Sequence, residues 1–479
     1  MIVAYERDGE RALHPNEGNS PQFLVFLPLM IRDENGQLEG RLARSWEHSP
    51  DYREWTYHLR TDLRWHNGMP VTAHDVKFTL DLLTHPDVLE WSPSTFESYT
   101  VLDDATVTVR YRQPRQNLYL DVYTVHYPKH LLEGLDPAEI DRWEFWTHPV
   151  GNGPYRFVRY VPQTMMEFEA NPDYYRGMPR IERVVLKFVG EAGLTELLSG
   201  NVDAVPYSNP VNIPQLGGDP RFRVYHWFLE GVARAIYWQH NNPLFRDPRV
   251  RRALTLAINR RELLKLLNLP EGVPIIDGPY TERQLQRGEL PVPLPYDPGE
   301  ARTLLDAAGW RDQDGNGVSE REGREFRFTA MVRSAYPFKE IAVYVQDQLR
   351  RVGVRMDVQM LDPILVSARL RTGDFEAAFT YTQVGPDSLA QYFGDGNPIG
   401  YENAELVELL ERARMTADPE AKDRVYRELT RIFRAEWPAT FLSPHVGTVF
   451  AHRRIKGLSS FWRANPVWFM EDLWLEEEN

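Results

Sequence analysis

Polar side chains at alternate positions form the clearest candidate for metal chemistry in this sequence. Asp312, Asp314 and Asn316 precede a glycine, which imitates the first half of an EF-hand calcium loop. Carboxylates with this spacing can converge on calcium, but the twelfth position of such a loop requires a bidentate glutamate. That position is Gly323, and only Glu320 and Glu322 lie nearby. The pattern favours a solvated turn, and we predict no metal site.

Other local signatures of catalysis or phosphate binding are weak. The run Gly151-Asn-Gly-Pro-Tyr-Arg lacks the third glycine of a dinucleotide loop, and Pro154 removes an amide that a phosphate would need. The sequence contains no His-Glu-x-x-His, Gly-x-Ser-x-Gly or P-loop pattern. The commonest local signatures of catalysis are therefore missing, so the site of an enzyme would have to lie outside these patterns, and no cofactor is expected. The two catalytic carboxylates of a glycosidase have no characteristic spacing in the sequence, so a hydrolase stays an open alternative.

The elements that would position a site differ between the two halves of the chain. Residues 55–60 and 106–112 alternate apolar and polar side chains, as half-buried strands do, and a helix is expected after Thr72. From about residue 246 helices and strands alternate. Asp297 followed by Pro298 marks a helix start. A strand at 326–332, a helix at 338–351 and a strand at 354–360 predict a βαβ unit with parallel strands.

Composition narrows the classes of function. A chain of 479 residues is too long for one ordinary core, so two or three compact units are expected. The formal charge of −14 disfavours nucleic-acid binding. The chain has no cysteine, and Pro28 interrupts the apolar stretch 23–31, which is shorter than a membrane-spanning helix. The first residues have no basic segment followed by an apolar one, so we expect a leader to be absent from this chain.

Several phrases in order along the chain resemble the family 5 solute-binding proteins, which include oligopeptide, dipeptide, nickel and some oligosaccharide binders. The most specific run is Leu42-Ala-Arg-Ser-Trp46, Trp55-Thr-Tyr-His-Leu-Arg60, Leu63-Arg-Trp-His-Asn-Gly68 and Val71-Thr-Ala-His-Asp-Val-Lys-Phe78. Later matches are Gly151-Asn-Gly-Pro-Tyr155, Asn171-Pro-Asp-Tyr-Tyr175, Leu198-Ser-Gly-Asn-Val-Asp-Ala204, Pro243-Leu-Phe-Arg-Asp-Pro-Arg-Val-Arg-Arg-Ala-Leu254, Ala307-Ala-Gly-Trp310, Gly385-Pro-Asp-Ser388 and Trp437-Pro-Ala-Thr-Phe441. The resemblance spans nearly the whole chain.

This resemblance implies an α/β fold of the type II periplasmic binding protein class, with two lobes and an inserted subdomain (cluster C). Lobe I would comprise residues 1–40, 150–238 and 446–479, the inserted subdomain residues 41–149, and lobe II residues 239–445. Hinges are expected near Tyr237 to His240 and Ser443 to Val446. Binding of a ligand by both lobes would close the molecule, since contacts with both exist only in the closed state.

The resemblance also suggests where a ligand would bind. Peptide-binding relatives commonly carry an aspartate near Thr382 that holds the ligand's α-amino group, and here that position is threonine. A buried ammonium without a carboxylate is costly, so a ligand with a free N-terminus is disfavoured unless Asp387 or another acid substitutes. Aromatic and amide side chains near the hinges suit peptides and sugars. The predicted ligand-binding residues are Trp238, Gln239, His240, Tyr381, Thr382, Gln383, Asp387 and His445.

The resemblance predicts a binding protein rather than an enzyme: an extracytoplasmic receptor that captures a peptide or another polar oligomer for an ABC importer. Its partners would be the solute and the permease subunits, with no nucleic acid, and a monomer is expected. The location would be periplasmic or extracellular, with the membrane reached only through the transporter or a lost lipid anchor. The alternatives are an oligosaccharide or metal-chelate binder, for which His240 and His445 would be of interest, and a cytosolic ligand sensor.

Overall fold

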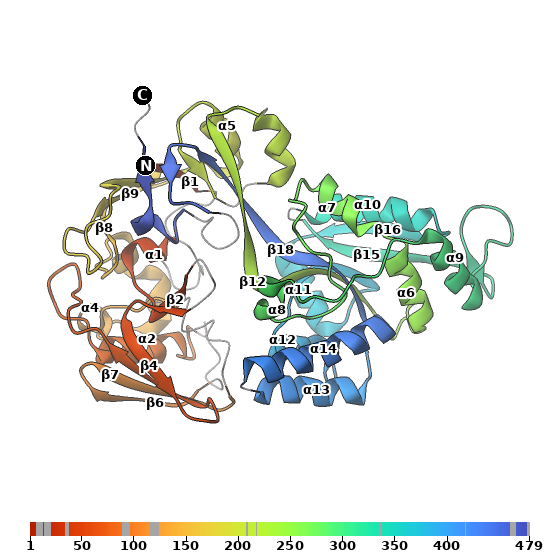
Figure 1. Cartoon of the computed structure of the whole chain (residues 1–479), viewed down its shortest axis with the longest axis horizontal. Helices are drawn as coiled ribbons and strands as arrows, with labels where there is room; N and C mark the ends of the chain where they lie inside the picture. The colour runs from red at the N-terminus through yellow and green to blue at the C-terminus, as the bar shows by residue number, and fades with distance from the viewer. Residues whose placement is uncertain are drawn as a thin grey trace. The chain divides into compact units, whose positions relative to one another are not determined.

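The computed structural model divides the chain into two compact units (Figure 1). The first contains residues 1–208, 212–227 and 447–479, and the second contains residues 209–211 and 228–446. The residues described are 1–5, 13, 21–33, 38–88, 96–114, 124–206, 209–216, 218–334, 337–416, 418–459 and 466–476. The boundary therefore falls inside two long strands, β12 (Phe222–Trp238) and β18 (Ala439–His452).

Over the described residues, the first unit contains two larger β-sheets and two two-stranded ones, which pair β2 (Met30–Arg32) with β3 (Leu38–Gly40) and β19 (Ile455–Lys456) with β20 (Trp474–Leu475). In its larger sheet, the first strand pairs in parallel with β10 and β11, and β8, β9 and β10 form an antiparallel series. These strands are β1 (Ile2–Tyr5), β8 (Tyr155–Val161), β9 (Met165–Ala170), β10 (Arg183–Phe188) and β11 (Ala204–Val205). A separate sheet has the order β4-β5-β7-β6. Its strands are β4 (Ala43–His48), β5 (Glu54–Leu59), β6 (Phe96–Asp103) and β7 (Thr106–Tyr111).

A helix begins after Thr72, as the sequence predicted, and it lies against this smaller sheet. Helix α2 (Ala73–Leu83) begins where Asp75 accepts a hydrogen bond from the Thr72 amide at 2.8 Å. The predicted strands at 55–60 and 106–112 correspond to β5 and β7. The division of lobe I at residues 41 and 149 stays a prediction, although β4 to β7 form a sheet of their own.

The second unit is an α/β sandwich with helices on both faces of a mixed sheet. The strand order is β16-β15-β17-β12-β18, formed by β15 (Arg327–Arg333), β16 (Arg355–Leu361), β17 (Ala377–Gln383) and the second-unit parts of β12 and β18. One face packs against α6 (Pro248–Leu256), α9 (Pro298–Ala307) and α10 (Phe338–Arg350). The opposite face packs against α11 (Pro363–Thr372), α12 (Pro386–Phe393), α13 (Ala404–Met415) and α14 (Pro419–Glu436). Figure 1 shows α10 beside β15 and β16.

Alternation along the strands determines which face each side chain joins. Phe328, Ala330 and Val332 of β15 belong to the core under α10, whereas Met331 belongs to the core on the other face. This is the period of two that a strand buried on both faces requires. The predicted βαβ unit is confirmed, since β15 and β16 pair in parallel from Arg327 with Arg355 to Arg333 with Leu361.

Two further expectations compare directly with the structure. Asp297 caps α9 by accepting a hydrogen bond from the Glu300 amide at 2.8 Å, as its place before Pro298 predicted. The boundaries between the compact units differ from the expected hinges in one case. The first lies between Trp227 and Phe228, earlier than Tyr237 to His240, because residues 228–238 of β12 pack within the second unit. The second follows Val446, at the end of the expected segment.

Candidate functional site

The carboxyl ends of three parallel strands meet at one edge of the second unit's sheet. β15 pairs in parallel with both β16 and β17, so Arg333, Leu361 and Gln383 end their strands on the same side. Antiparallel β12 brings Arg234 opposite Tyr381 at this edge. We call this region the carboxyl edge. In open α/β sheets, ligands bind outside the carboxyl ends of the strands, so this edge is the candidate site.

Arg333 is the most unusual side chain of the carboxyl edge. It is partly buried, and its guanidinium carbon lies 5.9 Å from the centroid of the Tyr381 ring. Its Nε atom is buried without a hydrogen-bond acceptor, and within the described ranges no carboxylate lies within 4.0 Å of its guanidinium. A partly buried charge without a counter-ion is costly. Arg333 is therefore a cation that is available to an anionic group.

Tyr381 is held in a fixed position beside this cation. Its ring meets Phe338 and His445 edge-on, each with a centroid separation of 4.7 Å. Burial raises the pKa of Tyr381, although Arg234 and Arg333 oppose the shift and Arg234 also hydrogen-bonds its hydroxyl. A phenol between two guanidinium groups and two rings has little rotational freedom. Tyr381 therefore provides a rigid wall next to Arg333.

A buried arginine, Arg234, and a neutral histidine, His445, contact Tyr381 and help to fix its position. Arg234 is 2% exposed and donates to the carbonyls of Pro444 at 3.3 Å and Val446 at 3.1 Å. Burial and the Arg234 charge hold the pKa of His445 well below its usual value, so this imidazole is neutral at physiological pH. The predicted residues Tyr381 and His445 are thus brought together, although they come from different strands.

Trp238, Gln239 and His240 occupy the interior of the second unit. Trp238 is completely buried against Phe245 and donates from Nε1 to Thr440 Oγ1 at 3.2 Å. The amide nitrogen of Gln239 donates to two backbone carbonyls, at 2.8 and 3.0 Å. Burial lowers the pKa of His240 to about 3, and its Nε2 lies 3.1 Å from the Pro438 carbonyl oxygen. These contacts favour structural roles, and ligand contact by these three residues stays a prediction.

The other three predicted residues lie on or near the end of β17. Thr382 is 2% exposed and accepts a hydrogen bond from the Tyr237 hydroxyl at 2.6 Å. Gln383 is exposed, and its Oε1 accepts from the Ser388 hydroxyl at 3.0 Å. Asp387 is 77% exposed and forms an ion pair with Arg414 at 2.7 Å. Gln383 is therefore accessible at the carboxyl edge, whereas Thr382 is covered.

Sequence reasoning missed Arg333 and Arg234. Arg333 is the last residue of the first strand in the βαβ unit, and that position was a usable signal because it is where such sheets bind ligands. Arg234 left no comparable signal. Its importance depends on the pairing of β12 with β17, which the sequence does not reveal.

The motifs considered for metal and phosphate binding have structural roles. In the exposed loop after α9, Asp312 accepts hydrogen bonds from the amides of Gly315 at 2.8 Å and Gly317 at 3.0 Å. Gly151 and Gly153 form a bend against Val25, where an added Cβ would meet Val25 backbone atoms at 1.9 and 2.7 Å. Over the described residues, no group of three or more histidine, aspartate or glutamate side chains could hold a metal ion.

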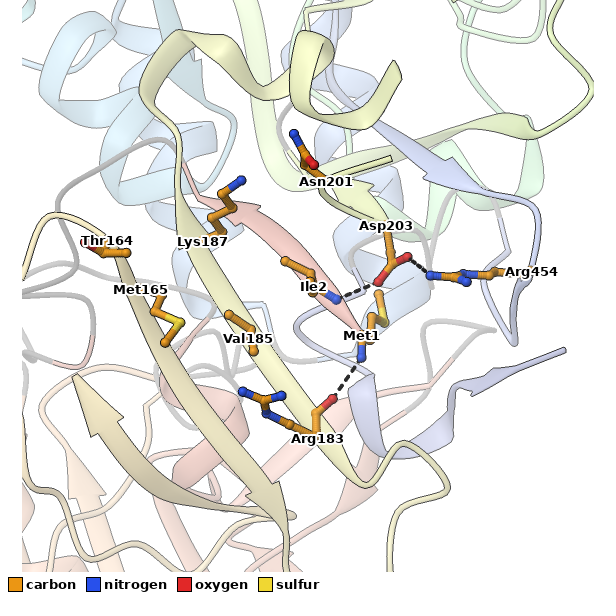
Figure 2. Close-up of a pocket in the computed structure, with 10 residues that line it drawn as sticks. All are labelled: Met1, Ile2, Thr164, Met165, Arg183, Val185, Lys187, Asn201, Asp203 and Arg454. Atoms are coloured by element: carbon orange, nitrogen blue, oxygen red, sulfur yellow. Dashed lines mark hydrogen bonds and ion pairs between the residues drawn. The ribbon is translucent and has the colours of Figure 1, made fainter. Parts of the chain in front are cut away.

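A pocket of about 510 Å³ lies in the first unit (Figure 2), but its charged groups are already engaged. Asp203 accepts a hydrogen bond from the Ile2 amide at 2.6 Å and pairs with Arg454. Arg183 pairs with Glu167, and Lys187 pairs with Glu196 at 2.5 Å. This pocket therefore offers a ligand less uncompensated charge than the carboxyl edge. None of the helices in the described ranges has the length and apolar character needed to span a membrane.

Comparisons with known proteins identify the family. Residues 37–398 match the model of bacterial extracellular solute-binding proteins, family 5. The chain belongs to this family. The oligopeptide-binding protein AppA of Bacillus subtilis is 25% identical, over 88% of this chain and 80% of the relative. The match confirms the prediction of a solute-binding protein rather than an enzyme.

Solved structures support the same fold. NikZ of Campylobacter jejuni, solved in complex with Ni(L-His), superposes with a TM-score of 0.78 and 22% identity, covering 99% of both chains. The ABC transporter substrate-binding protein CtaP of Listeria monocytogenes gives a TM-score of 0.81 at 22% identity, covering 100% of this chain and 99% of the other. The predicted fold class, a two-lobed type II binding protein, is confirmed.

Proposed function

We propose that this family 5 protein is the extracytoplasmic receptor of an ABC importer and that its solute is a peptide or a peptide-like oligomer. The relatives support this: one is named an oligopeptide-binding protein and another an ABC transporter substrate-binding protein. The permease subunits of the importer would be its protein partners. Location outside the cytoplasm follows from the family, and association with the membrane would occur through those permease subunits.

The observation that carries the ligand chemistry is the guanidinium of Arg333 at the carboxyl edge, whose charge is not balanced by any carboxylate in the part of the chain that the structure describes. Guanidinium groups bind carboxylates through two parallel N–H···O bonds, and partial burial strengthens such bonds because less water competes. The neighbouring ring of Tyr381 restricts the approach to one side. A peptide C-terminus, or an acidic side chain of the ligand, would match this arrangement.

The same edge offers little to a free α-amino group, in keeping with the expectation that threonine at position 382 disfavours such a group unless Asp387 substitutes. Thr382 is buried, and its hydroxyl already accepts a hydrogen bond from the Tyr237 hydroxyl. Asp387 is exposed, and its charge is already balanced by an ion pair with Arg414. An ammonium placed beside Arg333 would also be repelled. We therefore infer a preference for ligands whose amino end is blocked or lies away from this edge.

The experiment compares peptides that differ only at the C-terminus. Isothermal titration calorimetry would measure Kd for N-acetylated peptides ending in a free carboxylate or in an amide, after native mass spectrometry has shown any co-purified solute. Replacing Arg333 removes a charge-assisted interaction worth about 1.5–3 kcal/mol, so R333M should weaken binding of the carboxylate ligand roughly 10- to 100-fold. The amide ligand should bind weakly to both forms.

R327M is a matched control because Arg327 begins the same strand at its opposite end and already pairs with Asp357 at 2.7 Å. It should leave Kd unchanged. Equal affinity of the wild-type protein for carboxylate and amide peptides would contradict the proposal. If an oligosaccharide or a metal chelate were recovered from the purified protein and no peptide bound, the solute would be one of these alternatives and not a peptide. Capture by closure of two lobes stays a prediction.

A further inference from the structure

Two apolar side chains are exposed immediately beyond the carboxyl edge. Ile364 is 79% exposed and Leu365 is 46% exposed, and both lie in the first turn of α11. Single exposed apolar residues are ordinary on protein surfaces. Two adjacent ones, next to the Arg333 cation, form a distinct surface that we call the apolar patch.

The local structure explains why these side chains remain uncovered. Asp362 caps α11 by accepting a hydrogen bond from the Ile364 amide at 2.8 Å, and Pro363 occupies the first helical position. The helix buries Val366 and Leu370, four residues apart, in the core below the sheet. Because an α-helix has 3.6 residues per turn, Ile364 projects from the side of the helix away from that core. The fold thus fixes the patch in place.

The apolar patch is continuous with the position of Arg333. Leu361, at the end of β16, is the pairing partner of Arg333, and its carbonyl accepts from the Ser334 amide at 2.7 Å. Only Asp362 and Pro363 separate Leu361 from Ile364. Strand spacing of about 4.8 Å therefore places the start of α11 beside the end of β15. This edge therefore carries a cation and an apolar surface side by side, the two chemistries that the carboxylate and the side chain of a peptide's C-terminal residue require.

We propose that Ile364 and Leu365 form an apolar subsite that receives the side chain of the ligand's C-terminal residue, with that residue's carboxylate on Arg333. This inference rests on the proposed function and adds a specificity: peptides ending in leucine, isoleucine, valine or phenylalanine. Contact with the ligand removes water from apolar surface on both molecules, which is the dominant favourable term in such binding.

The test uses N-acetylated peptides identical except for a C-terminal alanine or leucine, titrated into the wild-type protein and into the I364S/L365S variant. The wild-type protein should bind the leucine peptide about tenfold more tightly, which corresponds to about 1.4 kcal/mol. In the variant the two peptides should bind within twofold of each other, and the alanine peptide should bind as it does to the wild type. V292S is a matched control, since Val292 is 82% exposed elsewhere in the same unit; it should keep the tenfold preference.

The outcomes separate this inference from the function on which it rests. If both peptides bind, require Arg333 and show no leucine preference, the receptor function stands and the apolar subsite is refuted. A preference that survives in I364S/L365S also refutes it. If ligand binding is unchanged in the variant but solute-stimulated ATPase activity of the reconstituted importer falls, the patch contacts the permease and the proposed subsite is wrong. If no carboxylate peptide binds the wild type, both the proposed function and the subsite fail.

Discussion

Replacing Arg251 with methionine removes a buried cation that joins two distant parts of the second unit. The side chain is 2% exposed and donates to four backbone carbonyls. Nη1 reaches Phe245 at 2.6 Å and Arg246 at 2.8 Å, and Nε and Nη2 reach Glu436 and Trp437 at 2.6 to 3.1 Å. Burial lowers the pKa of Arg251 to about 10, so the guanidinium stays charged at neutral pH.

The expected cost of R251M follows from the carbonyls left behind. Glu436 is the last residue of α14, so Arg251 satisfies carbonyls at a helix C-terminus that would otherwise be unpaired. A buried acceptor without a donor costs about 1–3 kcal/mol, and some of the four would regain water. Methionine keeps much of the side-chain volume but donates no hydrogen bond. We expect a loss of about 4 kcal/mol in the free energy of unfolding.

Urea unfolding followed by tryptophan fluorescence would measure this loss, with R252M as the control. Arg252 is the next residue and pairs with Glu300 at 2.6 Å, but the two side chains are 41% and 38% exposed. Such surface pairs contribute about 0–1 kcal/mol, so R252M should unfold at almost the wild-type urea concentration. If R251M lost less than about 1 kcal/mol, or no more than R252M, the carbonyl network would not be a principal source of stability.

Two further predictions concern pH and backbone geometry. Burial lowers the pKa of His66 and His126 to about 4 from an ordinary 6.5, so protonation favours the unfolded chain; stability is complete above about pH 6.5 and is lost as pH falls towards 4. A urea midpoint that stays constant across this window would contradict that assignment. G373A should cost about 3 kcal/mol, because Gly373 has a φ of +72° and a Cβ would lie 2.3 Å from the Pro398 carbonyl. G315A, at a φ of +77° with nothing within 4 Å, should cost about 1 kcal/mol in the same denaturation assay.

Local patterns were sufficient for several elements of the fold. The strand, helix and strand of the βαβ unit were predicted from the spacing of apolar residues, because each depends on neighbours within a few positions. The starts of α2 and α9 were predicted for the same reason, since a cap binds amides two or three residues away. The boundary within β12 could not be predicted this way, because it depends on which distant strands each half of β12 contacts.

The candidate site was likewise only partly predictable from the sequence. Sequence resemblance predicted Tyr381 and His445, which the fold brings to one place, and it also suggested Trp238, which is completely buried between Phe245 and Phe328. Tyr381 and Trp238 are both aromatic residues with a polar group. They differ in how far other parts of the chain bury them, which the sequence does not show.

The sequence by itself determined the family, the order of many helices and strands, and the local caps, because these depend on residue type and short-range spacing. The tertiary structure decided that Arg333 has no carboxylate partner among the described residues, that Trp238 is covered and that Ile364 is exposed. Burial and charge compensation depend on contacts with residues that are distant in the sequence. Short-range sequence patterns do not show which of those distant residues will be in contact.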